Sequence, residues 1–292
     1  MPVLSDVITA LDTLWPRAWA QDWDAVGTVC GDPGAEVSTV LFAVDPVREI
    51  ADEAVAVGAD LLVTHHPLYL RGTTTVAADT FKGRVVHSLI THGVALHVAH
   101  TNADIADPGV SDALADALGL RVTGPLAPDP ADPEGRRGLG RVCALDRPMT
   151  LAAFAEHAAA RLPATAQGVR ASGDPDRTVR TVAVSGGAGD SLFAEVRAAG
   201  ADAYLTADLR HHPASEAREH APVALLDAAH WATEWPWCQQ AAAQLDAVSE
   251  RRGWGLRTLV SHRVTDPWIL HQPSPSPRVS HPSPRVSQGA PN

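Results

Sequence analysis

VLFAVDPVREIADEAVAVGADLLVT, residues 40–64, has the pattern of a strand, a helix and a second strand. Val40–Val44 is a short apolar run of the kind that forms a buried strand. A proline suits the first turn of a helix and a glycine suits the position just after its last turn, so we expect a helix over 46–57, ending before Gly58. Leu61–Thr64 is the next predicted strand.

The same alternation continues along the chain. Val85–Ile90 predicts another helix, which ends near Gly93, and Val94–Val98 predicts another strand. Strands and helices that alternate in this order are typical of an α/β layer fold.

A second α/β region follows GPLAPDPADPEGRRG, residues 124–138, whose proline and aspartate content predicts a linker. GADAYLT at 200–206 resembles GADLLVT at 58–64 in residues and in context, which indicates a duplicated unit. We therefore expect two related α/β halves, 1–123 and 139–271. The elements predicted in the second half are strands at 182–184, 203–206 and 223–226 and a helix at 192–199.

The end of the chain has a different composition. PSPRVS occurs at 275–280 and again at 282–287, in a stretch rich in proline and serine. Such a stretch buries too little apolar area to offset the entropy lost on ordering. We expect residues 272–292 to form a disordered tail.

The overall composition narrows the class of protein. A formal net charge of −11 argues against nucleic acid as a partner, because phosphate-binding surfaces carry a basic excess. Cys30, Cys143 and Cys238 lie far apart, which favours neither a disulfide framework nor a thiolate metal site. No apolar run approaches the roughly 18 to 20 residues of a membrane span, and the N-terminus lacks the pattern of a signal peptide. We expect a soluble, cytoplasmic protein without a membrane partner.

Histidines follow several of the predicted strands directly. They occur in THHP at 64–67, in HTNAD at 100–104 and in DAAHWATE at 227–234. An isolated histidine pair is more often structural, but the carboxyl ends of strands in α/β sheets are where ligands bind. His230 and Glu234 are spaced i, i+4, so a helix beginning there presents both on one face. The three clusters together predict a metal site.

These motifs resemble those of the dinuclear-metal-centre hexameric proteins, often called GTP cyclohydrolase I type 2 homologues. WDAVG at 23–27 and GLGR at 138–141 also resemble family segments, and the resemblance covers about residues 1–265 in order. It implies two related three-layer α/β halves with mixed sheets and a dinuclear metal site between them. It also implies self-association to a homohexamer.

The resemblance carries metal ligands onto this chain residue by residue. Glu234 would bridge two divalent ions, with His66 and Asp104 on one ion and His65 and His230 on the other. Imidazole and carboxylate ligands suit zinc, manganese, iron or cobalt and do not choose among them. Two such ions lower the pKa of a bound water toward neutrality, which favours hydrolysis.

Other residues near these motifs have open roles. His100 is either a general acid or base, and then catalytic, or a structural hydrogen-bonding group. His212 matches a family position, but the TGD typical of that segment is Thr206, Ala207 and Asp208 here. SGGAGDS at 185–191 lacks the lysine of a P-loop, which favours a tight turn between a strand and a helix.

Two hypotheses about function follow from the sequence. The first is a metal-dependent hydrolase whose small-molecule substrate is a nucleotide or related heterocycle, with opening of the GTP ring implied by the resemblance. The second is a non-catalytic scaffold or regulatory oligomer that holds metal. The lack of an obvious arginine or lysine cluster for a triphosphate keeps the second hypothesis open.

Overall fold

The structure of the chain is a computed structural model that describes residues 1–273. Its first mixed sheet has the strand order β1-β4-β3-β2-β11. Neighbouring strands are parallel except for β1, which runs antiparallel to β4. The strands are β1 (Gly27–Cys30), β2 (Thr39–Ala43), β3 (Leu61–Thr64), β4 (Ala95–Val98) and β11 (Arg257–Val260).

Helices cover both faces of this sheet. Alternate residues of β2 point to opposite faces, as the pleat of a strand requires. Leu41 packs with α2 (Arg48–Ala56) and α3 (Phe81–Thr91), whereas Phe42 packs with α1 (Leu4–Leu14) and α9 (His230–Arg252). The predicted strands at 40–44, 61–64 and 94–98 and the helices between them are confirmed within a few residues.

The second mixed sheet has the order β5-β6-β8-β9-β10-β7. Strands β8, β9 and β10 are parallel, and β5, β6 and β7 pair antiparallel with their neighbours. Helices α7 and α8 cover one face, and α5, α6 and α9 cover the other. The elements are β5 (Arg121–Pro128), β6 (Gly138–Thr150), β7 (Val169–Ser172), β8 (Thr178–Ala188), β9 (Ala203–Ala207), β10 (Ala224–Ala228), α5 (Val110–Ala117), α6 (Leu151–Arg161), α7 (Phe193–Ala199) and α8 (His211–His220).

The two GAD segments have the same structural role in the two halves. Gly58 and Gly200 both adopt left-handed φ angles, of +66° and +63°, just after a helix. Asp60 Oδ2 accepts hydrogen bonds from the backbone N–H groups of residues 38 and 39, and Asp202 Oδ2 accepts from those of 180 and 181. In each half a preceding strand, β1 or β7, then pairs with the third strand of a β-α-β-α-β unit. The expected α/β fold with two mixed sheets is confirmed.

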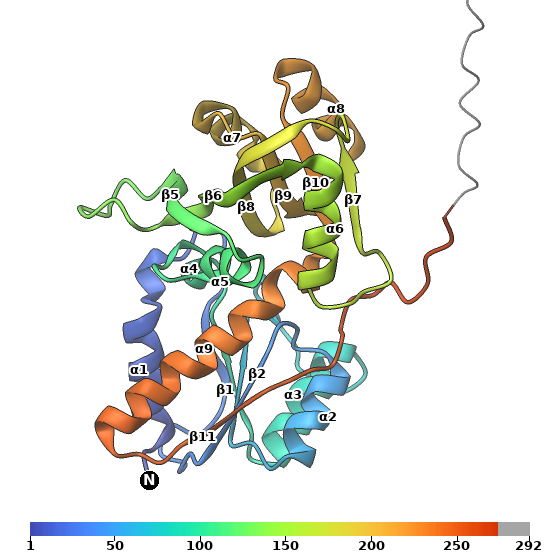
Figure 1. Ribbon diagram of the computed structural model, residues 1–292. Helices are drawn as coiled ribbons and strands as arrows, with labels where there is room; N and C mark the ends of the chain where they lie inside the picture. The colour runs from blue at the N-terminus through green and yellow to red at the C-terminus, as the bar shows by residue number, and fades with distance from the viewer. Residues whose placement is uncertain (274–292) are drawn as a thin grey trace, which may run out of the picture.

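Helix α9 joins the two halves. Its apolar face belongs to one continuous core with the inner faces of both sheets, and the helix lies along this junction (Figure 1). Arg141, in the GLGR motif on β6, adds a polar connection. This buried guanidinium donates to Asp112 on α5 and to the carbonyl oxygen of Ala106.

The connection between the halves differs from the predicted linker at 124–138. Residues up to Pro128 form the end of β5, and β6 begins at Gly138, so only 129–137 is a connecting loop of this hairpin. The proline-rich composition hid a strand because β5 lies at an edge of its sheet, where proline is tolerated. The chain also returns to the first sheet as β11, so residues 139–271 do not form one half alone. Most of the predicted tail, from residue 274 on, lies outside the described residues.

Candidate metal centre

The predicted site residues follow three different strands and meet at one place. His65 and His66 directly follow β3, and Asp104 lies in the short helix α4 (Thr101–Ile105) after β4. His230 and Glu234 lie in the first turns of α9, after β10. The carboxyl ends of strands from both sheets thus face each other, and the structure brings all five residues together.

The Glu234 carboxylate lies at the centre of this cluster. Its Oε1 is 3.0 Å from His230 Nε2 and 3.4 Å from His65 Nε2, and its Oε2 is 3.1 Å from His66 Nε2. Asp104 is more peripheral, because its Oδ1 lies 3.7 Å from His65 Nε2. A carboxylate surrounded by imidazole Nε2 atoms is a donor set that suits a transition-metal cation.

Two tests of fit support a cation at this place. Two groups have donor atoms within 4.8 Å of one another: His65, His66 and His100, and His66, His230 and Glu234. In addition, His65 Nε2 and Glu234 Oε2 are buried and have no hydrogen-bond partner among the described residues. Because an unsatisfied buried polar atom costs free energy, these donor atoms fit a bound metal ion.

The outer nitrogen of each imidazole is held by an oxygen acceptor. His66 Nδ1 lies 2.7 Å from Asp45 Oδ1, and His230 Nδ1 lies 2.7 Å from Asp208 Oδ2. His65 Nδ1 lies 3.0 Å from the carbonyl oxygen of Ala99. When Nδ1–H donates outward in this way, Nε2 is left as a lone-pair donor toward the centre, as is usual for histidine ligands.

A glycine makes room for the central carboxylate. Gly187, with φ of +67°, lies in the SGGAGDS segment at the end of β8, and a Cβ there would lie 2.4 Å from Glu234 Oε1. The Gly187 N–H donates to Thr233 Oγ1. Residues 185–188 of this segment are the end of β8, where a tight turn was predicted, so the turn is confined to Gly189, before the 3₁₀ helix η2 (Asp190–Leu192) and α7.

A cavity of about 650 Å³ opens onto the cluster. It is lined by residues of both halves, including Trp23 and His100 from the first and residues 185–188 at the end of β8 from the second. The His66, His230 and Glu234 side chains also line this cavity. The cluster is thus accessible to a small molecule from one side.

Comparison with known proteins assigns a family. The sequence profile of Duf34/NIF3 (NGG1p interacting factor 3) matches residues 2–267. The chain belongs to the Duf34/NIF3 family. A relative from Streptomyces coelicolor named GTP cyclohydrolase 1 type 2 homolog is 71% identical over the full length of both chains. One of the same name from Mycobacterium leprae is 38% identical and covers 91% of this chain and 95% of its own. The predicted family resemblance is confirmed.

Solved structures of Duf34/NIF3-like proteins share the fold. A Bacillus cereus protein related to NIF3 has a TM-score of 0.85 at 25% identity and covers 92% of this chain and 99% of its own. A Staphylococcus aureus protein has a TM-score of 0.84 at 27% identity with the same coverage. No helix in residues 1–273 of this Duf34/NIF3 member has the length and apolarity that a membrane crossing requires.

The electrostatics of this Duf34/NIF3 cluster are dominated by Glu234. Burial alone would raise the pKa of Glu234, but the charges of His66, His230 and His65 outweigh burial and hold that pKa well below its usual range. Burial alone would lower the pKa of His66, yet the charge of Glu234 and the hydrogen bond to Asp45 raise it to about 10. Burial would likewise lower the pKa of His230, but the charge of Glu234 and the hydrogen bond to Asp208 outweigh burial and raise it to about 11. The cluster thus favours positive charge around a buried carboxylate.

His100 lies on the wall of the cavity, beside the cluster. Its Nδ1 is 2.9 Å from Asp24 Oδ1, and Asp24 Oδ2 accepts hydrogen bonds from the N–H and hydroxyl groups of Thr101. Burial would raise the pKa of Asp24, but these hydrogen bonds and the charge of His100 outweigh burial and hold it well below its usual range. Asp24, from the WDAVG motif, is therefore an anion that orients His100.

Three further positions complete the comparison with the sequence analysis. His212 is exposed on α8 and is not among the residues that line the cavity, so the structure does not bring it to the cluster. Asp45 was not predicted, although it closely follows β2 at the same sheet edge as His65, and this placement is a usable signal. Asp208 has a φ of +55°, a conformation that tilts its carboxylate toward His230 at a position where the family TGD motif has its aspartate.

Proposed function

We propose that this Duf34/NIF3 protein is a dinuclear metal-dependent hydrolase that acts on a nucleotide or related heterocycle. His65, His66, Asp104, His230 and Glu234 would hold two divalent ions, with Glu234 as the bridging ligand. The observation that carries the proposal is the buried Glu234 carboxylate with an imidazole Nε2 atom 3.0 to 3.4 Å from each oxygen. The names of the relatives motivate GTP ring opening as the reaction to test first.

The metal ions and the protein side chains would supply different parts of the chemistry. When bound, two divalent ions supply Lewis acidity and lower the pKa of a coordinated water. His100, oriented by Asp24 on the cavity wall, would donate a proton to the departing nitrogen. Trp23, 58% exposed beside His100, offers an aromatic face to a planar ring in the cavity.

The lining of the cavity bears on the substrate. The described residues that line it include no lysine or arginine, the side chains that usually bind a triphosphate. This favours recognition of the heterocycle over recognition of the phosphates. The same observation supports the second candidate function, a homohexameric scaffold whose metal is not catalytic.

The deciding experiment measures metal content and turnover together. Elemental analysis should find about two divalent ions per chain. Glu234→Ala should lower the metal affinity by more than about 100-fold, because it removes a ligand and not merely an outer partner of one. His212→Ala, on an exposed position, is the matched control and should retain the metal. The His65→Ala protein should behave like Glu234→Ala.

Turnover of GTP then separates the two candidates. Ring-opened product should form with the metal-loaded protein, disappear in Glu234→Ala, and fall by about 10² to 10⁴-fold in His100→Ala while metal remains bound. Metal retention without any product would favour the scaffold. Full metal content in both His65→Ala and Glu234→Ala would refute the ligand assignment itself.

A further inference from the structure

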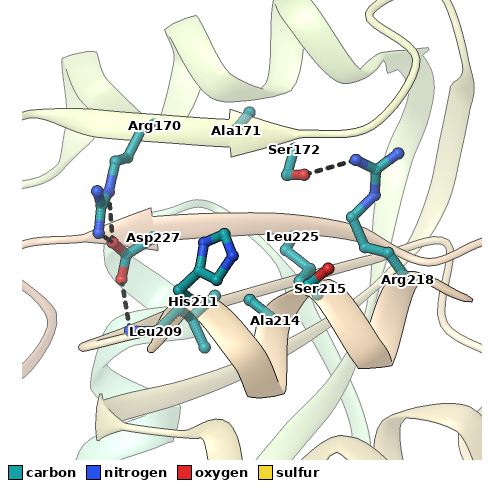
Figure 2. Close-up of a pocket in the computed structure, with 10 residues that line it drawn as sticks. All are labelled: Arg170, Ala171, Ser172, Leu209, His211, Ala214, Ser215, Arg218, Leu225 and Asp227. Atoms are coloured by element: carbon teal, nitrogen blue, oxygen red, sulfur yellow. Dashed lines mark hydrogen bonds and ion pairs between the residues drawn. The ribbon is translucent and has the colours of Figure 1, made fainter.

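A second cavity, of about 430 Å³, lies on the second half between β7 and α8 (Figure 2). None of the proposed metal ligands lines it. Strand β7 is the edge strand of its sheet, so the cavity lies where no further strand of residues 1–273 extends the sheet. We call this cavity the β7–α8 groove. Its volume is within the usual range of small-molecule sites.

Helix α8 presents polar side chains to the groove. Ala214, Ser215 and Arg218 follow His211 at spacings of three, four and seven residues, which places all four on one helix face. Only Ala217 of this helix is buried. The inward contacts of α8 are made by Ala217 and Ala214, whereas His211, Ser215 and Arg218 are exposed and form a polar wall of the groove that a ligand can reach.

The two arginines of the groove differ in their partners. Arg170 is paired with Asp227, with Nε and Nη2 at 2.7 and 2.5 Å from Oδ2. Arg218 donates to the neutral Ser172 hydroxyl at 3.0 Å, and no carboxylate within the described part of the chain lies within 4.0 Å of it. Figure 2 shows these arginines at opposite ends of the groove with His211 between them. Arg218 therefore keeps donors available for an anion.

The floor of the groove is apolar. Leu209, Leu225, Ala171 and Ala214 contribute its aliphatic surface. The site thus combines one uncompensated guanidinium and nearby hydroxyls with a surface suited to a small apolar group. The net charge of −11 makes nonspecific adsorption of anions unfavourable, so an anion that binds here needs specific contacts.

We propose that the β7–α8 groove binds a small phosphomonoester, with the phosphate on Arg218 and the Ser172 hydroxyl and the organic group over Leu209 and Leu225. The Arg218 guanidinium and the Ser172 hydroxyl can both donate hydrogen bonds to phosphate oxygens. This inference is independent of the proposed reaction at the metal centre.

The test uses phenyl phosphate as the probe, with inorganic phosphate as the anion without the ring and benzoate as an aromatic anion that carries a carboxylate in place of the phosphate. Calorimetric titration of the full chain should give saturable binding of phenyl phosphate, tighter than inorganic phosphate and tighter than benzoate. Arg218→Ala should weaken the binding about tenfold or more. Arg218→Lys should weaken it by less, because lysine keeps the positive charge and loses only the paired N–H donors of the guanidinium. Arg121→Ala, an exposed arginine on β5 at the opposite edge of the sheet, is the matched control and should bind like the unmodified protein.

A Glu234→Ala protein separates the groove from the metal centre, since phosphate oxygens also bind metal ions. Binding that persists in Glu234→Ala and weakens in Arg218→Ala supports the groove. Binding lost in Glu234→Ala but unchanged in Arg218→Ala assigns the probe to the metal centre and overturns the proposal. No saturable binding, or benzoate tighter than phenyl phosphate, also overturns it.

Discussion

The two halves of the molecule share one arrangement of strands and helices but carry different side chains at their strand ends. Each has a β-α-β-α-β unit, an edge strand antiparallel to its third strand, and an aspartate that accepts two backbone hydrogen bonds at or near the start of its first strand. After the second and third strands, the first half places His65, His66, His100 and Asp104. The second half places Asp208, His230 and Glu234 there, and Gly187 at the end of its first strand.

This difference shows where the chemistry of the site resides. The backbone frame brings strand ends together, and only the few residues that follow the strands decide what those ends can bind. The first half supplies most of the imidazoles, whereas the second supplies the central carboxylate and the glycine that makes room for it. Neither half alone contains the donor set that surrounds Glu234.

The largest expected contrast between the halves is in their pH dependence. The N–H groups of Ala95 and Ala224 donate to the carbonyl oxygens of Asp60 and Asp202, so His97 on β4 occupies the position that Leu226 occupies on β10. Burial lowers the pKa of His97 to about 4, while its ordinary value is 6.5. Between these values the unfolded chain binds more protons, so folding stability is lost as pH falls from about 6.5 toward 4.

His97→Leu, which copies the second half, should remove this loss, of about 3 kcal/mol. Denaturant unfolding at pH 7 and pH 4 would measure it, and comparison between variants cancels the contribution of the other titrating groups. His92→Leu, at an exposed position, is the control and should retain the dependence. An unchanged pH profile in His97→Leu would show that His97 is not held neutral by burial.

A smaller effect tests the feature that the halves share. Asp60→Ala and Asp202→Ala each remove a carboxylate that accepts two backbone N–H hydrogen bonds. Each should lower the free energy of unfolding by about 2 kcal/mol, since charge-assisted hydrogen bonds contribute more than neutral ones. Asp52→Ala, which removes only an exposed ion pair with Arg48, should cost much less. A large cost at Asp60 with none at Asp202 would break the equivalence of the halves.

The parts of the fold and of the site that depend on local sequence pattern could be predicted from the sequence. Apolar runs and their glycine stops identified β2, β3 and β4, and histidines directly after strands identified the cluster. Strand β5 was missed because its prolines are typical of loops and its edge position is a tertiary property. Asp45 and Thr265 were missed because their roles depend on contacts between residues far apart in the chain. The close approach of Gly187, in the SGGAGDS segment, to Glu234 also could not be predicted from local pattern.

The smallest expected effect concerns how the two halves hold their imidazoles. Thr265 Oγ1 donates to Asp45 Oδ2 at 2.5 Å, and Asp45 in turn contacts His66 Nδ1. Asp208 contacts His230 Nδ1, but no other side chain in residues 1–273 forms a hydrogen bond with Asp208. Direct outer partners of metal ligands are worth about 10- to 100-fold in metal affinity, so a group one hydrogen bond further out should be worth less than about tenfold. Thr265→Val should therefore weaken metal binding by less than about tenfold in equilibrium titration with a competing chelator, and Thr265→Ser should restore it. A loss as large as that of Glu234→Ala would instead mean that residues after β11 are part of the metal site itself.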